Sequence, residues 1–116
     1  MKNKFSRYND GIVAIYREKE RKTDFNAPRN VSTLDDMDFV YKLAYEEMSK
    51  REQDLQFAEQ MGFSLSLKIK TRYVKDVDDE CKAVIDGWLY DISSLDKSKT
   101  ESFLYMTRIR KVGESN

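Results

Sequence analysis

The stretch FSLSLKIKTRY, residues 63–73, alternates between two kinds of side chain over its whole length. An alternation with a period of two is typical of a β-strand that buries one face. One face of the predicted strand is mostly apolar and the other is polar and basic: Phe63, Leu65, Leu67, Ile69, Thr71 and Tyr73 oppose Ser64, Ser66, Lys68, Lys70 and Arg72. We therefore expect a half-buried strand, the first of an antiparallel meander.

Downstream of this strand, three further strands are predicted at residues 81–85, 88–92 and 102–111. The dipeptide Asp86-Gly87 joins the first two, and it suits a type I′ turn because both central residues of that turn need positive φ. The last strand has apolar residues on both faces, which predicts burial by the barrel interior and by a helix or a neighbouring subunit. Cys81 is expected to be a small buried residue, and Trp88 to anchor the core.

Upstream, residues 11–17 and 39–45 are rich in β-forming residues and predict two more strands. In the second of these, Phe39, Tyr41, Leu43 and Tyr45 are expected on one side. The order of elements predicts a mostly β, α+β fold, a small antiparallel barrel or sandwich of about six strands with one helix. Residues 1–116 would form a single domain with a flexible arm at 1–10 and a long loop at 18–37.

The one predicted helix covers residues 50–61. Ser49 and Glu52 have the spacing of a capping box, and Gly62 is placed to end the helix in a left-handed conformation. Leu55 and Ala58 would supply its apolar stripe.

The composition argues against catalysis. The chain has no histidine, and its four glycines lie far apart, so histidine-based active sites, the usual zinc sites and a phosphate-binding loop are not expected. We predict that the protein is not an enzyme and has no cofactor or metal. The acidic residues of 76–80 lack the spacing of a calcium loop, and a solvated turn is the preferred interpretation.

The cysteine count and the hydropathy indicate where the protein is made. One cysteine excludes an internal disulfide, and neither a signal peptide nor a membrane-spanning run of apolar residues is recognisable. We therefore expect a soluble, cytoplasmic chain at synthesis, with no membrane partner.

Two basic rows allow two interpretations. One row is Lys68, Lys70 and Arg72, and the other is Arg108 and Arg110. They would serve a nucleic-acid-binding barrel of the OB type, or they would form a charged outer face or a salt-bridged subunit interface. The 21 basic residues equal the 21 acidic ones, which favours the subunit interface.

An ordered set of residues resembles a known family. Arg72-Tyr73, an acidic turn, and the hairpin residues Val84, Asp86-Gly87, Tyr90 and Ile92 resemble the head–tail joining family of tailed bacteriophages, also called head closure or stopper proteins. The strand-then-helix segment 45–58 is similar as well, and the resemblance covers residues 40–112. The N-terminal part departs from the family, because its loop is more charged than the family pattern.

The resemblance implies a virion protein that forms a ring below the portal and adaptor, holds the packaged DNA in and presents a surface to the tail. Its partners would be copies of itself, the portal or adaptor protein and the tail completion protein, with phage DNA nearby in the channel. It would be located at the head–tail interface of the virion and, during assembly, in the host cytoplasm. A tail completion ring protein and an OB-like nucleic-acid-binding module remain alternatives.

The long loop is the part that such a ring protein would direct to the channel or to a neighbour. Loops of this length in compact domains are commonly either functional or disordered, and we favour a functional role. The residues predicted to make these contacts are Arg17, Lys19, Arg21, Lys22, Asp24, Phe25, Pro28 and Arg29.

Overall fold

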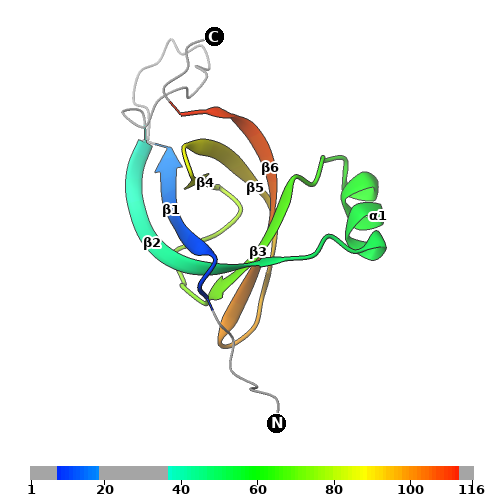
Figure 1. Cartoon of the computed structure of the whole chain (residues 1–116), viewed down its shortest axis with the longest axis horizontal. Coiled ribbons are helices and arrows are strands. Elements are labelled where there is room, and N and C mark those ends of the chain that lie inside the picture. The colour runs from blue at the N-terminus through cyan, green and yellow to red at the C-terminus, as the bar shows by residue number, and fades with distance from the viewer. Residues whose placement is uncertain (1–7, 19–36, 113–116) are drawn as a thin grey trace.

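Six strands close into an antiparallel barrel, and one short helix lies outside it (Figure 1). The computed structural model describes residues 8–18 and 37–112. Around the barrel the strand order is β1-β2-β3-β6-β5-β4, and the pairing of β1 with β4 closes it. The elements are β1 (Gly11–Glu18), β2 (Met37–Met48), α1 (Glu52–Met61), β3 (Leu67–Arg72), β4 (Cys81–Ile85), β5 (Trp88–Lys97) and β6 (Glu101–Lys111). The predicted mostly β fold with six strands and one helix is confirmed.

The hairpin between β4 and β5 turns as the sequence predicts. Asp86 has φ of 51° and Gly87 has φ of 80°, which are the two positive values that a type I′ turn requires. The next connection is shorter than expected, because β5 continues to Lys97 and leaves only residues 98–100 as a turn. Ser98 closes this turn by accepting a hydrogen bond from the backbone N–H of Glu101.

The barrel interior is a continuous apolar core. Its most deeply buried members come from all six strands or the loop before β4, and they include Val13, Ile15, Leu43, Ile69, Val77, Ala83, Ile92, Leu104 and Met106. On β6, Leu104 and Met106 point inwards, whereas Phe103 and Tyr105 alternate with them and lie partly buried. Tyr105 packs edge-on against Phe57 of α1, with ring centroids 5.7 Å apart. The predicted burial of β6 on both faces is therefore confirmed, with the helix on its outer side.

A bulge in β2 overturns part of the predicted side-chain pattern. Leu43 and Tyr45 are buried as expected, but Phe39 is 56% exposed and Tyr41 is 47% exposed. Ile15 pairs with Tyr41 and the next residue, Tyr16, pairs with Phe39, so Val40 is an extra residue in the ladder. An extra residue shifts the alternation of faces. The prediction that all four residues share one side is therefore wrong for Phe39. Tyr41 pairs with the buried Ile15 and so stays on the side of Leu43 and Tyr45, although it is 47% exposed.

The predicted eleven-residue strand is shorter at both ends. Only Leu67–Arg72 forms β3, and residues 63–66 lead from the helix into it. Phe63 packs edge-on against Phe57 of α1 at 6.0 Å, so it serves the helix rather than the sheet. Tyr73 lies past the end of the strand and is 39% exposed.

The helix also begins and faces differently from the prediction. It starts at Glu52, and its cap is formed by Asp54, whose carboxylate accepts the backbone N–H of Arg51 at 2.9 Å. The Ser49–Glu52 capping box is therefore wrong, while the left-handed Gly62 at the other end, with φ of 87°, is confirmed. The buried positions are Asp54 and Ala58, and Leu55 is 47% exposed. Among the described residues no helix is long and apolar enough to span a membrane.

Candidate interaction surfaces

The outer face of β3 and β6 is covered by α1 through a buried ion pair. Lys68 of β3 donates hydrogen bonds to both carboxylate oxygens of Asp54, at 3.2 and 3.1 Å. Lys68 is 4% exposed and Asp54 is 5% exposed. The ammonium group of Lys68 also lies 5.3 Å from the ring centroid of Tyr105 and 5.7 Å from that of Phe103. Lys68 thus fastens the helix to the barrel.

The surroundings of Asp54 favour its charged form. Burial alone raises the pKa of this carboxyl group, but hydrogen bonds from the backbone of Arg51 and from Lys68, together with their charges, outweigh burial. The resulting pKa lies below the ordinary value of an aspartate. The ion pair is therefore intact at neutral pH, and acid would weaken the attachment of the helix.

The other two cations of β3 are also engaged within the subunit. The ammonium of Lys70 lies 3.2 Å from a carboxylate oxygen of Glu46 and 3.8 Å from one of Glu101. The guanidinium of Arg72 lies 5.6 Å from the ring centroid of Tyr8, in the segment that leads into β1. In this row Lys68 and Lys70 are thus paired with carboxylates, and Arg72 lies against an aromatic ring. Its predicted role as a subunit interface or a nucleic-acid surface stays a prediction.

The second basic row lies apart from the first. β6 pairs with β3 only as far as Met106, so Arg108 and Arg110 lie beyond the shared ladder. Arg108 stacks on Trp88, with its guanidinium 4.2 Å from the ring centroid, and donates a hydrogen bond to the hydroxyl of Tyr90. Arg110 is half-buried and pairs with Leu89. The structure does not bring the two rows into one patch.

The outer face of β1 and β2 is an exposed apolar surface, and the sequence interpretation missed it. Ile12 is 54% exposed, and Phe39 is exposed beside Tyr16, with ring centroids 5.7 Å apart. Ala14 and Val84 lie between them on the same face, since they pair with each other across β1 and β4. The available signal was the apolar character of β1 on both faces, a pattern interpreted only for the last strand. We call Ile12, Tyr16 and Phe39 with their neighbours the bare face.

A second exposed apolar surface lies beside α1, on the opposite side of the barrel. Leu55, Ala58, Gly62, Phe63 and Leu65 line an open groove of about 470 Å³ with Glu59 and Ser64. In the strand order, β6 under the helix is three strands from β1 in either direction. Figure 1 shows α1 outside the β3 side of the barrel, with β1 and β2 across from it. The two apolar surfaces therefore lie on opposite sides of the barrel.

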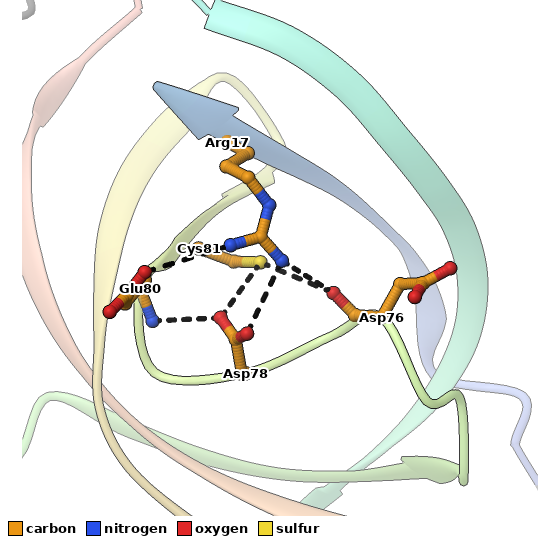
Figure 2. Close-up of polar contacts among 5 residues, drawn as sticks. All are labelled: Arg17, Asp76, Asp78, Glu80 and Cys81. Atoms are coloured by element: carbon orange, nitrogen blue, oxygen red, sulfur yellow. Dashed lines mark hydrogen bonds and ion pairs between the residues drawn. The ribbon is translucent and has the colours of Figure 1, made fainter. Parts of the chain in front are cut away.

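The acidic turn before β4 is held by Arg17, at the end of β1 (Figure 2). Arg17 donates hydrogen bonds to the carbonyl oxygen of Asp76 at 2.8 Å and to a carboxylate oxygen of Asp78 at 3.3 Å. A weaker ion pair joins it to Glu80 at 3.9 Å. The thiol of Cys81 lies under this contact, 3.6 Å from the Asp78 carboxylate and 3.7 Å from the Asp76 carbonyl. We call this set of residues the Arg17 contact.

The charges of the Arg17 contact reinforce one another. Burial raises the pKa of Asp78, but hydrogen bonds from the Glu80 backbone and from Arg17 outweigh it and hold that pKa below its usual value. Burial raises the pKa of the Cys81 thiol, which keeps it protonated and unreactive. No group of metal-ligating side chains occurs among the described residues, and the guanidinium occupies the carboxylate of Asp78. The contact fixes the turn to β1.

Arg17 is the one member of the predicted loop set that the structure describes. Lys19, Arg21, Lys22, Asp24, Phe25, Pro28 and Arg29 lie outside the described residues. Glu18 and Met37, at the two ends of the predicted loop, belong to β1 and β2. Tyr8, in the predicted N-terminal arm, donates a hydrogen bond to Glu101, and Asp10 accepts one from the backbone of Glu47.

No protein-family model matches the chain, and no curated protein matches its sequence.

Proposed function

We propose that this chain is a structural subunit of the head–tail connector of a tailed bacteriophage. Copies form a ring below the portal or adaptor, retain the packaged DNA and present the surface to which the tail attaches. The observation that carries the proposal is the pair of exposed apolar surfaces on opposite sides of one closed barrel. The sequence resemblance to head closure proteins is the reason why we propose a role in a tailed bacteriophage.

A closed barrel restricts how copies can associate. In the described residues every strand of the barrel pairs with a neighbour on each side, although residues 37–44 of β2 pair only with β1 and residues 107–111 of β6 pair only with β5. Contacts between copies through the two exposed apolar surfaces suit this closed strand order better than strand addition. Two different surfaces on opposite sides favour head-to-tail contacts, which generate a ring when the rotation closes. Exposed apolar groups at both surfaces are typical of an interaction site.

The fold itself agrees with what the resemblance implies. The family expectation is a small β-barrel with one helix, and here α1 is inserted between β2 and β3. The segment that resembles the family, residues 40–112, contains β3 to β6, most of β2 and the helix. The agreement supports the proposal at the level of fold.

The cations weigh against the nucleic-acid-binding alternative. A surface that binds a phosphate backbone needs several accessible lysines or arginines. Lys68 is buried in an ion pair, and Lys70 lies between two carboxylates. Four of the five cations named for that role stack on an aromatic ring or pair with an acid. A protein partner therefore suits the described surface better.

The test removes the gene from the phage that encodes it and supplies it from a plasmid as the control. We expect filled heads that lose DNA and do not join tails, alongside free tails, and rescue by the plasmid copy. Particles that join normally without the gene would overturn the proposal. Adding purified protein to isolated heads and to isolated tails then separates head closure from tail completion, since the protein should bind the heads.

A further inference from the structure

The groove beside α1, which we call the socket, is open, and Glu59 is the acidic residue of its lining. Leu65, 9% exposed, belongs to its apolar lining, Leu55 forms a half-exposed wall, and Glu59 is exposed next to them. A Cβ atom placed on Gly62 would meet nothing within 4 Å, so this end of the groove is open. Glu59 has no ion-pair or hydrogen-bond partner for its side chain among the described residues. The socket can therefore accept an apolar side chain with a cation beside it.

The bare face carries that combination. Phe39 is the most exposed aromatic residue of the described chain, and Lys42 is exposed on the same outer face of β2. Tyr16 pairs with Phe39 and Ala14 pairs with Lys42, so the two side chains are two positions apart along β1, or about 7 Å. Leu55 and Glu59 are one helical turn apart, about 6 Å between Cβ atoms. The spacing between Phe39 and Lys42 on the bare face therefore matches the spacing between Leu55 and Glu59 at the groove.

We propose that Phe39 of one copy docks in the α1 groove of the next copy, with Lys42 paired to Glu59 across the contact. The inference rests on the ring proposed above and names the surfaces that build it. Like-with-like association is disfavoured, because two bare faces would bring Lys42 against Lys42 and two grooves would bring Glu59 against Glu59. Only the head-to-tail arrangement places unlike charges opposite each other.

The first experiment is a cysteine cross-link between the two surfaces. Phe39→Cys and Leu55→Cys are combined in one chain, oxidised both as concentrated purified protein and in assembled particles, and analysed without reductant. Cys81, 2% exposed, does not compete. We expect a ladder of covalent oligomers from the double variant and monomer from each single variant. Lys99→Cys with Leu55→Cys is the matched control, since Lys99 lies in the β5–β6 turn, and it should give no ladder.

Each other outcome overturns the proposed contact. Dimers from Phe39→Cys alone would show a like-with-like interface, and a cross-link to a band of another mass would show a different occupant. The absence of a ladder in both samples would remove this interface, while joining of heads and tails by the wild-type protein would leave the proposed function standing. Normal joining without the gene would instead refute the function, independently of the cross-link.

Charge reversal tests the ion pair separately. Lys42→Glu and Glu59→Lys should each weaken association at least ten-fold by analytical ultracentrifugation, or lower the infectious yield if the ring forms only on heads. A chain with both changes, or an equal mixture of the two single variants, should recover, because either restores unlike charges at every contact. Lys99→Glu should have no effect. Failure of both the double variant and the mixture to recover would contradict the pairing of Lys42 with Glu59.

Discussion

The outer face of β3 and β6 and the outer face of β1 and β2 belong to the same barrel but differ in what covers them. On the first, Phe103 and Tyr105 lie partly buried, with Phe57 of α1 packed on Tyr105. On the second, Ile12 and Phe39 are more than half exposed. Both faces carry apolar groups that favour burial. The difference teaches that the chain covers one apolar face with its own helix and leaves the other exposed.

The two faces also differ in how they handle charge. Under α1, Lys68 is buried and neutralised by Asp54, and this pair has a fixed geometry. On the bare face, Lys42 is exposed and has no side-chain partner among the described residues. A buried pair stabilises the subunit only while both members are present, whereas an exposed lysine costs little and is free to select a partner.

The largest expected effect comes from breaking the covered face. Asp54→Ala leaves Lys68 buried without its carboxylate and removes the helix cap, so the free energy of unfolding should fall by about 3–5 kcal/mol. Urea denaturation measures this value. The double variant Asp54→Leu, Lys68→Met should recover most of the loss, because it removes both charges together. Asp79→Ala, at an exposed residue of the acidic turn, is the control and should change stability by less than about 0.5 kcal/mol. Equal free energies of unfolding for wild type and Asp54→Ala would contradict a stabilising role for this ion pair.

Aromatic truncation compares the two faces directly. Tyr105→Ala removes the ring that packs on Phe57 and should cost about 2 kcal/mol of stability, since the residue is partly buried. Phe39→Ala should cost less than about 1 kcal/mol, because it removes an exposed ring with one edge contact to Tyr16. The order should reverse in self-association, where Phe39→Ala has the larger effect. Thermal unfolding and sedimentation measure the two quantities. A larger stability loss from Phe39→Ala would mean that the bare face serves the fold.

Local patterns in the sequence predict most of the strands. The Asp86-Gly87 turn and the two-sided β6 follow from backbone stereochemistry and apolar alternation, which act over a few residues. The closure of β1 on β4 does not follow from such patterns, because it joins segments about seventy residues apart and the ladder records only Ala14 to Arg17 against Cys81 to Val84. The bulge at Val40 does not follow from such patterns either, because one extra residue moves the side chains beyond it to the other face without changing the composition.

The surfaces were harder to predict than the strands. The alternation around Lys68 predicts that its side chain faces solvent. In the structure α1 covers it, and Asp54 of that helix, at a position also expected to be polar and exposed, pairs with it. Pairing across fourteen residues and two elements has no periodic signature. Phe39 was expected on the same side as Leu43 and Tyr45 because of the alternation of residues 39–45, and only the register of β1 with β2 shows that it faces outwards.

Acid should weaken both the covered face, through Asp54, and the Arg17 contact, through Asp78. The pKa values of Asp54 and Asp78 lie below the usual 3.8, so their contribution to stability is present above that pH and is lost as the pH falls through the lower folded values. Each carboxylate adds a slope of at most about 1.4 kcal/mol per pH unit in this window. Unfolding by urea between pH 7 and pH 2 measures it. Asp54→Asn combined with Asp78→Asn should flatten the fall of the unfolding free energy at acid pH, because both lowered pKa values are removed. Parallel profiles for wild type and the double variant would contradict the assignment.

The smallest expected effect is local to the Arg17 contact, which belongs to neither face. Arg17 and Asp78 are each more than one third exposed, so their pair should contribute no more than about 1 kcal/mol. Arg17→Ala should therefore speed hydrogen exchange of the Glu80 and Cys81 amides about five-fold, because these amides donate to Asp78 within the turn that Arg17 holds. In Arg17→Lys the exchange rates of these amides should lie between those of wild type and Arg17→Ala. An ammonium group lacks the planar, forked geometry with which the guanidinium bonds both the Asp76 carbonyl and the Asp78 carboxylate. The amide of Leu104 in the core is the internal control. If its exchange accelerates equally, the change is global, and Arg17 supports the whole barrel rather than this turn.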